Sequence, residues 1–292
     1  MSFIVKFFLR FGEKFFNKFF YNSNYKPIQR LRLIEKKVNI LYESNLDFSS
    51  DKFTTISELL ISTIQEENIV RMGSENDGGY VLVNKSFKDS LLISMGIGLN
   101  LDFEEDWIKK GGKVVAFDGT ITKVNSNVLS ESIYNFKWKK QNINLIGDEE
   151  SITINQAIHN ALETFKLGWE EASLVLKMDI ENSEWNALQK ISEQNLSRFD
   201  QIIVEFHDLI KMTLIDFDKV HKVLGKLHKN FDLVWKHENN FSPYFIHRNT
   251  RFFDVVETTW HNKKSVIDSL ELPKSDLFKA LNSPNDPSYP NY

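Results

Sequence analysis

Cysteine is absent from this chain of 292 residues. Its absence excludes disulfides, thiolate nucleophiles and cysteine-bound zinc or iron–sulfur clusters together. That composition agrees with a reducing, cytoplasmic location, which we expect for this protein. Three motifs are also missing: the Gly-x-x-x-x-Gly-Lys-Ser/Thr phosphate loop, the His-Glu-x-x-His zinc motif and the Gly-x-Ser-x-Gly nucleophile elbow. The sequence therefore disfavours the enzyme classes that depend on those motifs.

The charged residues are unevenly distributed along the chain. In total, 36 basic and 40 acidic residues give a net charge of −4. Residues 1–40 hold nine Lys or Arg and two acids, a net charge of +7, so residues 41–292 carry −11. An acidic body is a poor match for a polyanionic nucleic acid, and we expect no nucleic-acid partner.

The first 20 residues combine eight phenylalanines with basic side chains. The phenylalanines share one broad helical face, and the basic residues recur every four positions on the other face: Lys6, Arg10, Lys14 and Lys18. Because charges interrupt every apolar run here, we expect neither a signal peptide nor a membrane-spanning helix. Two interpretations stay open. The helix makes peripheral membrane contact through residues 1–20, or it packs on the protein body or a second subunit.

Downstream of this arm, short apolar strands alternate with helix-like segments. A hairpin is expected over 69–83, and further strands at 91–93, 114–117, 174–179, 201–205, 231–235 and 251–260. Helices are expected at 101–110, 155–165, 184–194 and 214–228. This alternation predicts an α/β fold with a mainly parallel, doubly wound sheet. We divide the chain into a Phe-rich helix and linker (1–25), a helical lead-in (26–68), the α/β domain (69–270) and a tail (271–292), with 284–292 as a surface extension.

The stretch from Ser94 to Gly98, Ser-Met-Gly-Ile-Gly, follows the first core strand of this domain. Asp118 comes twenty residues after Gly98 and ends the next predicted strand. Glycines allow a tight turn and a close backbone approach to a ligand, and an acid at the second strand end can bind a ribose diol. This unit is typical of a domain that binds a nucleoside-type cofactor.

The residues after the glycines bear on which cofactor is bound. A dinucleotide fingerprint requires a third small residue, and Leu101 stands at that position. The helix that follows opens with Asp102, Glu104 and Glu105, which would repel a pyrophosphate. The same acids suit a sulfonium ligand without phosphates, such as S-adenosylmethionine. The pattern therefore disfavours NAD.

Polar residues stand at four successive strand ends, where open α/β sheets bind their ligands. They are Gly96 and Gly98, Asp118, Asp179 and Glu181, and Glu205 and His207. Other interpretations stay open for some of them: a helix N-cap for Asp118, helix-terminus electrostatics for Asp179 and Glu181, and a hydrogen bond to a carbonyl for His207. Tyr80 and Trp185 are expected to be packing residues. A metal site built from Asp179, Glu181 and His207 is disfavoured, and we expect no metal.

An ordered set of motifs runs from about residue 69 to 260. It consists of Arg71-x-Gly73, Asp77-Gly-Gly-Tyr80-Val, Ser94-x-Gly96-Ile97-Gly98, Phe103-Glu104, Phe117-Asp118-Gly-Thr120, Leu176-Lys177-Met-Asp179-Ile-Glu181-x-x-Glu184-Trp185, Gln201…Glu205-x-His207, His237-x-Asn239-Asn240 and Asp254-Val-Val-Glu257. The set resembles the FkbM-type family of S-adenosylmethionine-dependent methyltransferases. This resemblance implies a Rossmann-like methyltransferase sheet, here with an N-terminal helical extension, and O-methylation of a hydroxyl on a sugar, glycan or related small molecule.

The resemblance also implies roles for individual residues. S-adenosylmethionine would be bound by the first strand end and the second: Ser94, Gly96, Gly98, Asp118 and Gly119. The acceptor would contact Glu181, His237, Asn239 and Asn240. Two positions depart from the family pattern, because Ser94 stands where an acid is common and Asn182 where glycine is common.

We expect His207 to act as the base, since the ordinary histidine pKa lies near neutral pH, and Asp179 or Glu205 to orient it or the acceptor. Two other functions were weighed. An NAD-dependent oxidoreductase is disfavoured by Leu101 and the acids after it. A non-catalytic module anchored by the N-terminal helix is disfavoured by the intact row of polar strand ends.

Overall fold

The computed structural model of this chain describes residues 50–62, 69–124, 134–147, 150–168, 173–265, 281–289 and 291. The chain divides after Leu46, and all the described residues belong to the compact unit Asp47–Tyr292. The predicted Phe-rich helix and linker (1–25) lie outside the described residues. Most of the predicted helical lead-in (26–68) also does, apart from residues 50–62.

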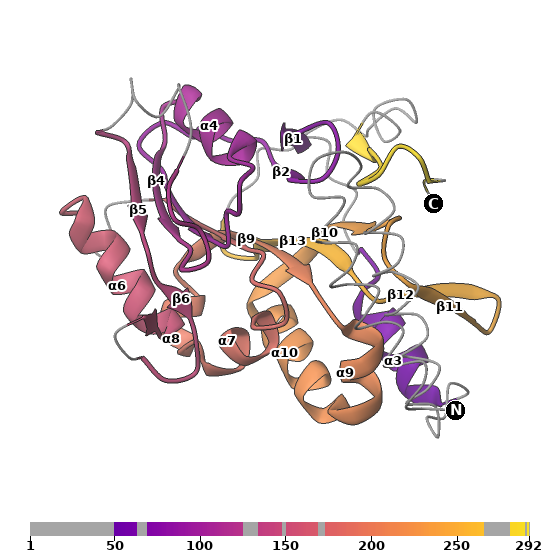
Figure 1. The fold of residues 1–292 in the computed structure, drawn as a ribbon. Coiled ribbons are helices and arrows are strands. Elements are labelled where there is room, and N and C mark those ends of the chain that lie inside the picture. The colour runs from indigo at the N-terminus through magenta and orange to yellow at the C-terminus, as the bar shows by residue number, and fades with distance from the viewer. Residues whose placement is uncertain are drawn as a thin grey trace, which may run out of the picture. The chain divides into compact units, whose positions relative to one another are not determined.

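Strands and short helices alternate along this unit (Figure 1). The helices are α3 (Asp51–Leu59), α4 (Asp102–Lys109), α6 (Ile154–Thr164), α7 (Glu184–Lys190), α8 (Glu193–Leu196), α9 (Leu209–Ile215) and α10 (Phe217–Asn230). The strands are β1 (Ile69–Gly73), β2 (Gly79–Val83), β3 (Leu91–Met95), β4 (Lys113–Phe117), β5 (Phe136–Lys139), β6 (Asn142–Ile143), β7 (Ser151–Ile152), β8 (Leu174–Met178), β9 (Phe199–Phe206), β10 (Phe231–Glu238), β11 (Tyr244–His247), β12 (Thr250–Phe253) and β13 (Val256–Asn262).

In the described part of the chain, seven strands form the main sheet, in the order β10-β13-β9-β8-β3-β4-β5. Neighbouring strands from β9 through β8, β3 and β4 to β5 pair in parallel, whereas β13 pairs antiparallel with both β9 and β10. The chain runs outward from β3 to β5 and then crosses to β8 on the other side of β3, which makes this the topological switch point. The predicted Rossmann-like, doubly wound α/β sheet is confirmed.

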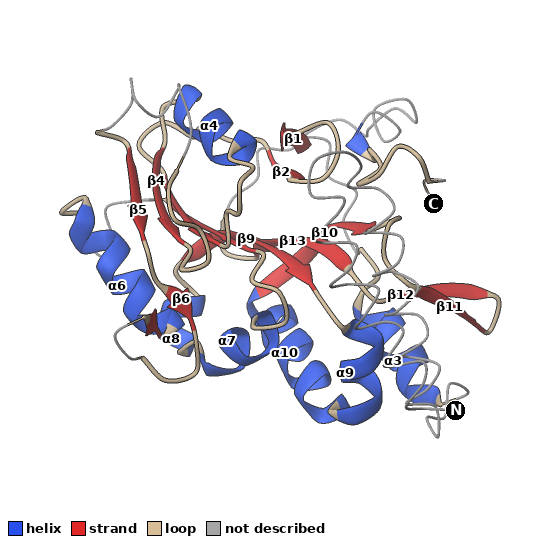
Figure 2. Cartoon of the chain, viewed as in Figure 1, coloured by secondary structure: helices blue, strands red, loops and turns tan. Residues whose placement is uncertain are grey.

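The two faces of the sheet are covered by different elements (Figure 2). Helices α6, α7 and α10 lie on one side, and α4 lies on the other. The apolar residues of α10 recur at helical spacing and are buried: Val220, Val223, Leu224 and Leu227. Helix α6 begins with a capping box, in which Thr153 and Gln156 each bond the backbone of the other.

The predicted hairpin forms as β1 and β2, and it covers the sheet next to α4, over β9, β10 and β13. Two buried side chains of the sheet hold β2. The amide of Gln201 accepts from Val83 N at 2.8 Å and donates to Val83 O at 3.0 Å, and Thr259 Oγ1 donates to Val81 O. These contacts fix the position of Tyr80 within β2 above the end of β9.

Three predicted elements have different boundaries. The strand expected over 251–260 is split into β12 and β13. The break falls at Asp254, where the backbone carbonyl accepts from Leu209 N and the side chain accepts from Ile210 N. These bonds attach the break to the start of α9, and a continuous strand would lose them. The helices expected at 184–194 and 214–228 are likewise divided into α7 with α8 and α9 with α10. The edge strand β5 was not predicted.

The described residues of the surface extension expected over 284–292 are packed in part, since Asn285 is buried whereas Pro287, Ser288 and Asn291 are exposed. The side chain of Asn285 donates to Glu257 Oε1 at 2.6 Å. Leu281 packs with Val81 and Val83 of β2. Leu281 and Asn285 are therefore part of the packed body. Within the described residues, no helix has the length and apolarity needed to span a membrane.

Candidate cofactor and acceptor site

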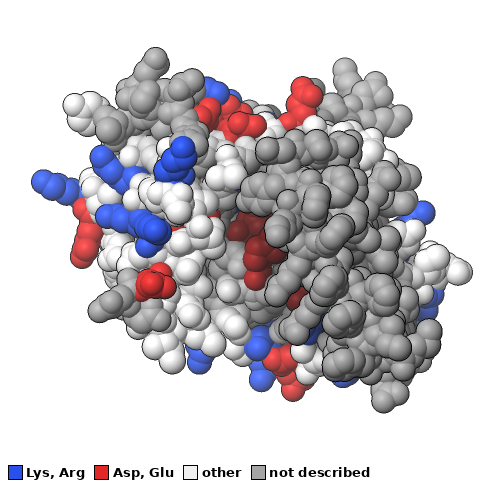
Figure 3. Space-filling view, in the orientation of Figure 1, with Lys and Arg blue, Asp and Glu red and all other residues white. Residues whose placement is uncertain are grey.

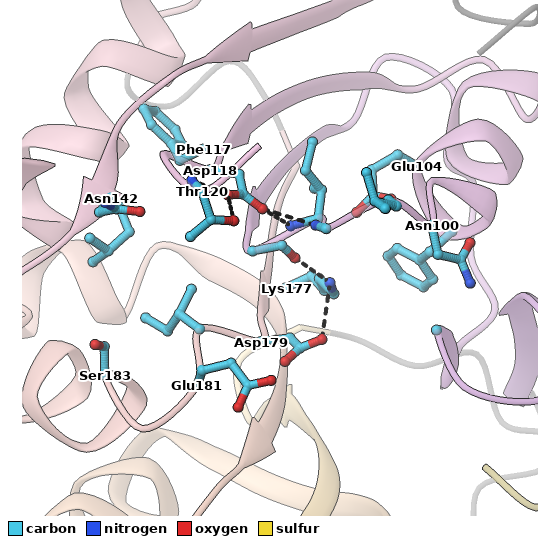
Figure 4. A pocket seen from close by; sticks show the side chains of 18 of the residues that line it. Asn100, Glu104, Phe117, Asp118, Thr120, Asn142, Lys177, Asp179, Glu181 and Ser183 are labelled. Atoms are coloured by element: carbon cyan, nitrogen blue, oxygen red, sulfur yellow. Dashed lines mark hydrogen bonds and ion pairs between the residues drawn. The ribbon is translucent and has the colours of Figure 1, made fainter. Parts of the chain in front are cut away.

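A pocket of about 430 Å³ lies at the carboxyl ends of β3, β4 and β8, next to the switch point (Figure 4). Its described lining is rich in acids and holds one basic side chain, that of Lys177. The acidic lining residues are Asp77, Glu104, Asp118, Asp179 and Glu181. The space-filling view shows acidic side chains deep in a hollow at the centre of this face (Figure 3). The arrangement attracts cations and repels phosphates.

The turn after β3 crosses the end of β8 very closely. Gly96 has a φ of +77°, and a Cβ on it would lie 1.7 Å from the carbonyl oxygen of Asp179. Lys177, itself buried, donates from Nζ to the Gly96 carbonyl oxygen at 2.6 Å and lies 3.8 Å from Asp179 Oδ2. Gly96 is therefore required by both its positive φ and the lack of space for a side chain, and it lines the pocket.

Asp118 holds this turn from the end of β4. Its Oδ2 accepts from the backbone N–H groups of Ile97 and Gly98 at 3.1 and 2.9 Å, and its Oδ1 accepts from Thr120 N and Oγ1 at 2.8 and 2.6 Å. Burial opposes the charged form, but the hydrogen bonds outweigh it, so the pKa of Asp118 lies below its ordinary value. The carboxylate thus accepts four hydrogen bonds from the protein. The ribose role predicted for it would require sharing or displacing one of them.

The other predicted cofactor residues lie at different depths. Ser94 is fully buried within β3 and is not a lining residue, and its Oγ donates to Oε1 of the lining residue Glu104. Gly98 lines the pocket. Gly119 lies beside it and donates from N to the side chain of the lining residue Asn142 at 3.1 Å.

His207 follows β9 and is almost surrounded by carboxylates. Its Nδ1 lies 3.1 Å from Glu184 Oε1, and its Nε2 lies 3.8 Å from Asp179 and Glu181 and 3.9 Å from Glu205. Burial lowers the pKa of His207, but the hydrogen bond to Glu184 and the neighbouring carboxylates outweigh it and raise the pKa to about 10. At neutral pH the ring is then an imidazolium with no lone pair to accept a proton. This charge state does not favour the base role predicted for His207.

Glu205 lies at the end of β9 and is buried. Its Oε1 accepts from Asn239 Nδ2 at 3.1 Å, and its Oε2 lies 3.0 Å from the hydroxyl of Tyr80. Burial, followed by repulsion from Asp179 and Glu257, raises the pKa of Glu205 well above its ordinary value. Glu205 and His207 are not among the described residues that line the pocket, whereas Asp77 is. Burial, followed by repulsion from Asp179, raises the pKa of Asp77 as well.

The four predicted acceptor residues separate into two groups. Glu181 lines the pocket with its side chain 80% exposed, and Asn239 reaches Glu205. His237 and Asn240 instead bind the end of the chain. The ring nitrogens of His237 face the side-chain oxygens of Asn282 and Asn285, and Asn240 Nδ2 donates to carbonyls of the segment 286–289.

Asn182, which stands where the resembled family commonly has glycine, adopts a backbone conformation that favours glycine. Asn182 has a φ of +81° and Glu181 a φ of +50°. Asparagine tolerates the left-handed region better than most residues, so the turn after β8 can keep a shape that otherwise favours glycine.

Several site residues were not assigned a role from the sequence. They are Asp77, Tyr80, Thr120, Asn142, Lys177 and Glu184. Most of them stand inside the motifs quoted above, and that position is the signal that points to them. Tyr80 was expected only to pack. It does pack edge-on against Phe103, and its hydroxyl also contacts two acids. Trp185 stacks on Phe206 as a packing residue and donates from Nε1 to His207 O at 2.8 Å.

A metal site was also considered. Across the residues that the structure describes, no group of three or more His, Asp or Glu side chains is arranged to hold a metal ion.

Comparisons with known proteins give structural similarity only. No family model matches the chain, and no curated protein matches it. An rRNA methylase from Streptococcus thermophilus is 13% identical with a TM-score of 0.31, covering 61% of this chain and 89% of that chain. The 1,6-didemethyltoxoflavin-N1-methyltransferase from Burkholderia thailandensis, with bound 1,6-didemethyltoxoflavin and S-adenosylhomocysteine, is 9% identical with a TM-score of 0.31, covering 60% and 72%.

The C-terminal domain of precorrin-6Y C5,15-methyltransferase from Rhodobacter capsulatus is 10% identical with a TM-score of 0.28, covering 60% of this chain and 80% of that chain. At these TM-scores the similarity carries no conclusion about this chain, and the fold class rests on its own strand order. One of these proteins is named for an RNA substrate class, rRNA. The comparisons therefore do not support our expectation that this protein has no nucleic-acid partner.

Proposed function

We propose that this protein is an S-adenosylmethionine-dependent methyltransferase of the FkbM type that methylates a hydroxyl oxygen. The observation that carries the proposal is the acid-lined pocket at the switch point of the sheet, beside the glycine turn Gly96–Gly98. Nucleoside cofactors bind at this place in doubly wound sheets. The lining selects among them, because its acids suit a sulfonium and an ammonium group and disfavour a pyrophosphate.

The start of α4 supports the same choice. A dinucleotide places its pyrophosphate on the helix N-terminus that follows the glycine turn. Here the first turn of α4 carries Asp102, Glu104 and Glu105, and Glu104 faces into the pocket as a buried acid. Burial raises the pKa of Glu104, although Lys177 and the hydrogen bond from Ser94 oppose that shift. Acidic groups in this turn oppose a pyrophosphate and suit the cationic end of S-adenosylmethionine.

The surroundings of His207 support an uncharged acceptor that carries hydroxyl groups, such as a sugar or glycan. Asp179 and Glu181 lie on the pocket side of the imidazole, and carboxylates accept hydrogen bonds from hydroxyls. The same carboxylates repel phosphates, which disfavours nucleic acids and sugar phosphates. Bound S-adenosylmethionine supplies a methyl group activated by the sulfonium, so the protein's part is to hold the acceptor oxygen in line with it and remove its proton.

Calorimetric titration of the full chain with S-adenosylhomocysteine, S-adenosylmethionine and NAD tests the cofactor. We expect the two sulfur ligands to bind and NAD not to bind. Binding of NAD alone would favour an oxidoreductase, and binding of none of the three would refute the proposal. Transfer of a labelled methyl group to a panel of neutral sugars, amino sugars and sugar phosphates then tests the acceptor. We expect label on neutral hydroxyl acceptors, and label confined to phosphorylated ones would contradict the acceptor class.

We further propose peripheral membrane contact through residues 1–20, on the sequence pattern of that segment. Sedimentation with vesicles that contain anionic lipid tests it. The full chain should bind, and the double substitution Phe8→Ser and Phe15→Ser should abolish binding. Equal sedimentation of both proteins would contradict the contact.

A further inference from the structure

Three polar side chains from different elements meet behind the pocket. Tyr80 comes from β2, Asp179 follows β8 and Glu205 ends β9. The hydroxyl of Tyr80 lies 3.1 Å from Asp179 Oδ2 and 3.0 Å from Glu205 Oε2. For hydrogen bonds between oxygens, 3.0 Å is the upper end of the usual range and 3.1 Å lies just beyond it.

A count of protons constrains this arrangement. A phenol carries one proton, whereas an ionised carboxylate can only accept hydrogen bonds. If both acids were ionised, Tyr80 could donate fully to only one of them, and its oxygen lone pairs would face the other carboxylate. Both contacts are full hydrogen bonds only when one carboxyl is protonated and donates to the phenol oxygen.

Burial and neighbouring charge decide which acid holds that proton. The Glu205 side chain is 6% exposed and that of Asp179 is 30% exposed. Asp179 lies 3.8 Å from the Lys177 ammonium, whereas His207 Nε2 lies at almost the same distance from both acids, 3.8 Å from Asp179 and 3.9 Å from Glu205. Removing a carboxylate from water disfavours its charged form, and nearby cations favour it. The proton therefore belongs on Glu205, and Asp179 is the ionised partner.

The other titratable groups around Glu205 agree with this assignment. The acids Asp179, Glu257 and Asp77 face it from three other segments and disfavour its charged form, and His207 opposes them. Burial and this excess of acids raise the pKa of Glu205 well above its ordinary value despite His207. The remaining oxygen of Glu205 accepts from Asn239, which suits a neutral acid as well as a charged one.

Tyr80 has little freedom to leave this position. It is 2% exposed, its ring packs edge-on against Phe103 with centroids 5.5 Å apart, and the Lys177 ammonium lies 5.3 Å from its ring centroid. The strand that carries it is held by Gln201 and Thr259. The hydroxyl is therefore fixed between the two acids by packing on all sides.

We propose that Tyr80 is a positioning residue that fixes one arrangement of protons. Glu205, as a carboxylic acid, donates to the phenol oxygen, and the phenol hydroxyl donates to the Asp179 carboxylate. The consequence for catalysis, which rests on the proposed function, is that Asp179 is the proton acceptor. As the acceptor oxygen bonds to the methyl carbon, the carbon–sulfur bond breaks, its electron pair stays on sulfur, and the hydroxyl proton moves to Asp179.

Infrared spectroscopy of the full chain without ligands at neutral pH tests the arrangement directly. The carbonyl stretch of a protonated carboxyl group is separate from the bands of carboxylates. We expect such a band in the wild type, its loss in Glu205→Gln, and a shift to higher frequency in Tyr80→Phe, since the carboxyl group loses its acceptor. Tyr244→Phe, which removes a hydroxyl on β11, is the matched control and should leave the band unchanged.

Two results would overturn the proposal. The first is that Glu205→Gln removes no carbonyl band of a protonated carboxyl group from the wild-type spectrum. The second is that the band keeps its frequency in a folded Tyr80→Phe variant. This measurement needs no methyl donor, so its failure is distinguishable from failure of the cofactor titration. On an acceptor that takes up label, Tyr80→Phe should also lower kcat with little change in the acceptor KM, because the Asp179 carboxylate loses the hydrogen bond that holds it in place. An unchanged kcat would refute the catalytic consequence.

Discussion

Ser94 and Glu104 form a hydrogen bond between the central strand β3 and the helix that follows the glycine turn. Ser94 Oγ donates to Glu104 Oε1 at 2.5 Å, and both residues are buried. Ser94 stands where the methyltransferase pattern that this sequence resembles commonly has an acid, and Glu104 lines the pocket. The carboxyl group missing from the strand is thus supplied by α4, ten residues later.

Exchanging the Ser94 hydroxyl and the Glu104 carboxyl group tests whether cofactor binding needs an acid at this place, whichever residue supplies it. Glu104→Gln should weaken binding of S-adenosylhomocysteine about tenfold or more, because a neutral amide attracts the ligand's ammonium group less. The double variant Ser94→Asp with Glu104→Ser restores an acid at the same place and should recover most of that affinity. Calorimetric titration measures both effects. Equal affinity of Glu104→Gln and the wild type would exclude a role for this acid in cofactor binding.

Removing only the donor of this pair should affect stability more than binding. Ser94→Ala leaves a buried carboxyl oxygen without its hydrogen bond, which costs about 1–3 kcal/mol. We expect a loss of that size in the free energy of unfolding, measured by urea denaturation. Ser265→Ala, which removes a partly buried hydroxyl bound to Asp200, is a control for losing a hydroxyl near the surface. A larger loss in Ser265→Ala would contradict the importance of burial at Ser94.

The two glycines of the turn offer a matched comparison. Gly96 and Gly98 both have a positive φ, but a Cβ on Gly96 would collide with Asp179 O at 1.7 Å, whereas one on Gly98 meets nothing within 4 Å. Gly98→Ala should therefore cost about 1–2 kcal/mol of stability from backbone strain alone. Gly96→Ala should cost distinctly more, because the turn must move away from β8. Denaturation midpoints of the two variants check this order, and equal midpoints would contradict it.

The periodicity of the sequence was sufficient for the sheet, because buried parallel strands are continuous apolar runs whose ends are easily recognised. The periodicity could not predict how deeply the side chain of each site residue is buried. Ser94 lies only two residues before the glycine turn, yet its side chain points into the core toward α4, because neighbouring strand residues face opposite sides of the sheet. Tyr80 has the pattern of a packing residue, and only the fold brings Asp179 and Glu205 to its hydroxyl.

The sequence was equally unable to predict the partners of the residues expected to bind the acceptor. His237 and Asn240 stand in a motif that resembles a family pattern, but their partners lie about 45 residues later in the chain. A polar residue beside a site has the same sequence pattern whether it binds a ligand or the chain itself. Only the position of residues 281–289 distinguishes the two roles.

The pair His237 and Asn285 is predicted to stabilise the fold rather than bind the acceptor. Asn285 joins His237 Nε2 at 2.9 Å to Glu257, and all three side chains are buried. His237→Ala and Asn285→Ala should each lower the free energy of unfolding by about 1–3 kcal/mol, and the double variant should lose less than the sum. Additive losses, or a change in acceptor KM without loss of stability, would contradict this role.

Two buried histidines are predicted to give the stability opposite dependences on pH. The folded state raises the pKa of His207 to about 10 and, chiefly through burial, lowers that of His261 to about 4, both from 6.5. The contribution of His207 is complete below pH 6.5 and is lost as the pH rises toward 10, because the folded state then holds the extra proton. The contribution of His261 is complete above pH 6.5 and is lost as the pH falls toward 4. Each proton changes the stability by at most about 1.4 kcal/mol per pH unit.

Differences between the wild type and single variants isolate these contributions from those of the other titrating groups. Urea denaturation from pH 4 to 10 should show that His207→Gln removes part of the loss of stability between pH 6.5 and 10. His261→Gln should instead alter the slope between pH 4 and 6.5, and it serves as the control for replacing a buried histidine. If His207→Gln leaves the slope above pH 6.5 unchanged, the ring is neutral in the folded protein. The base role of His207 would then be restored, and the assignment of that role to Asp179 would lose its main support.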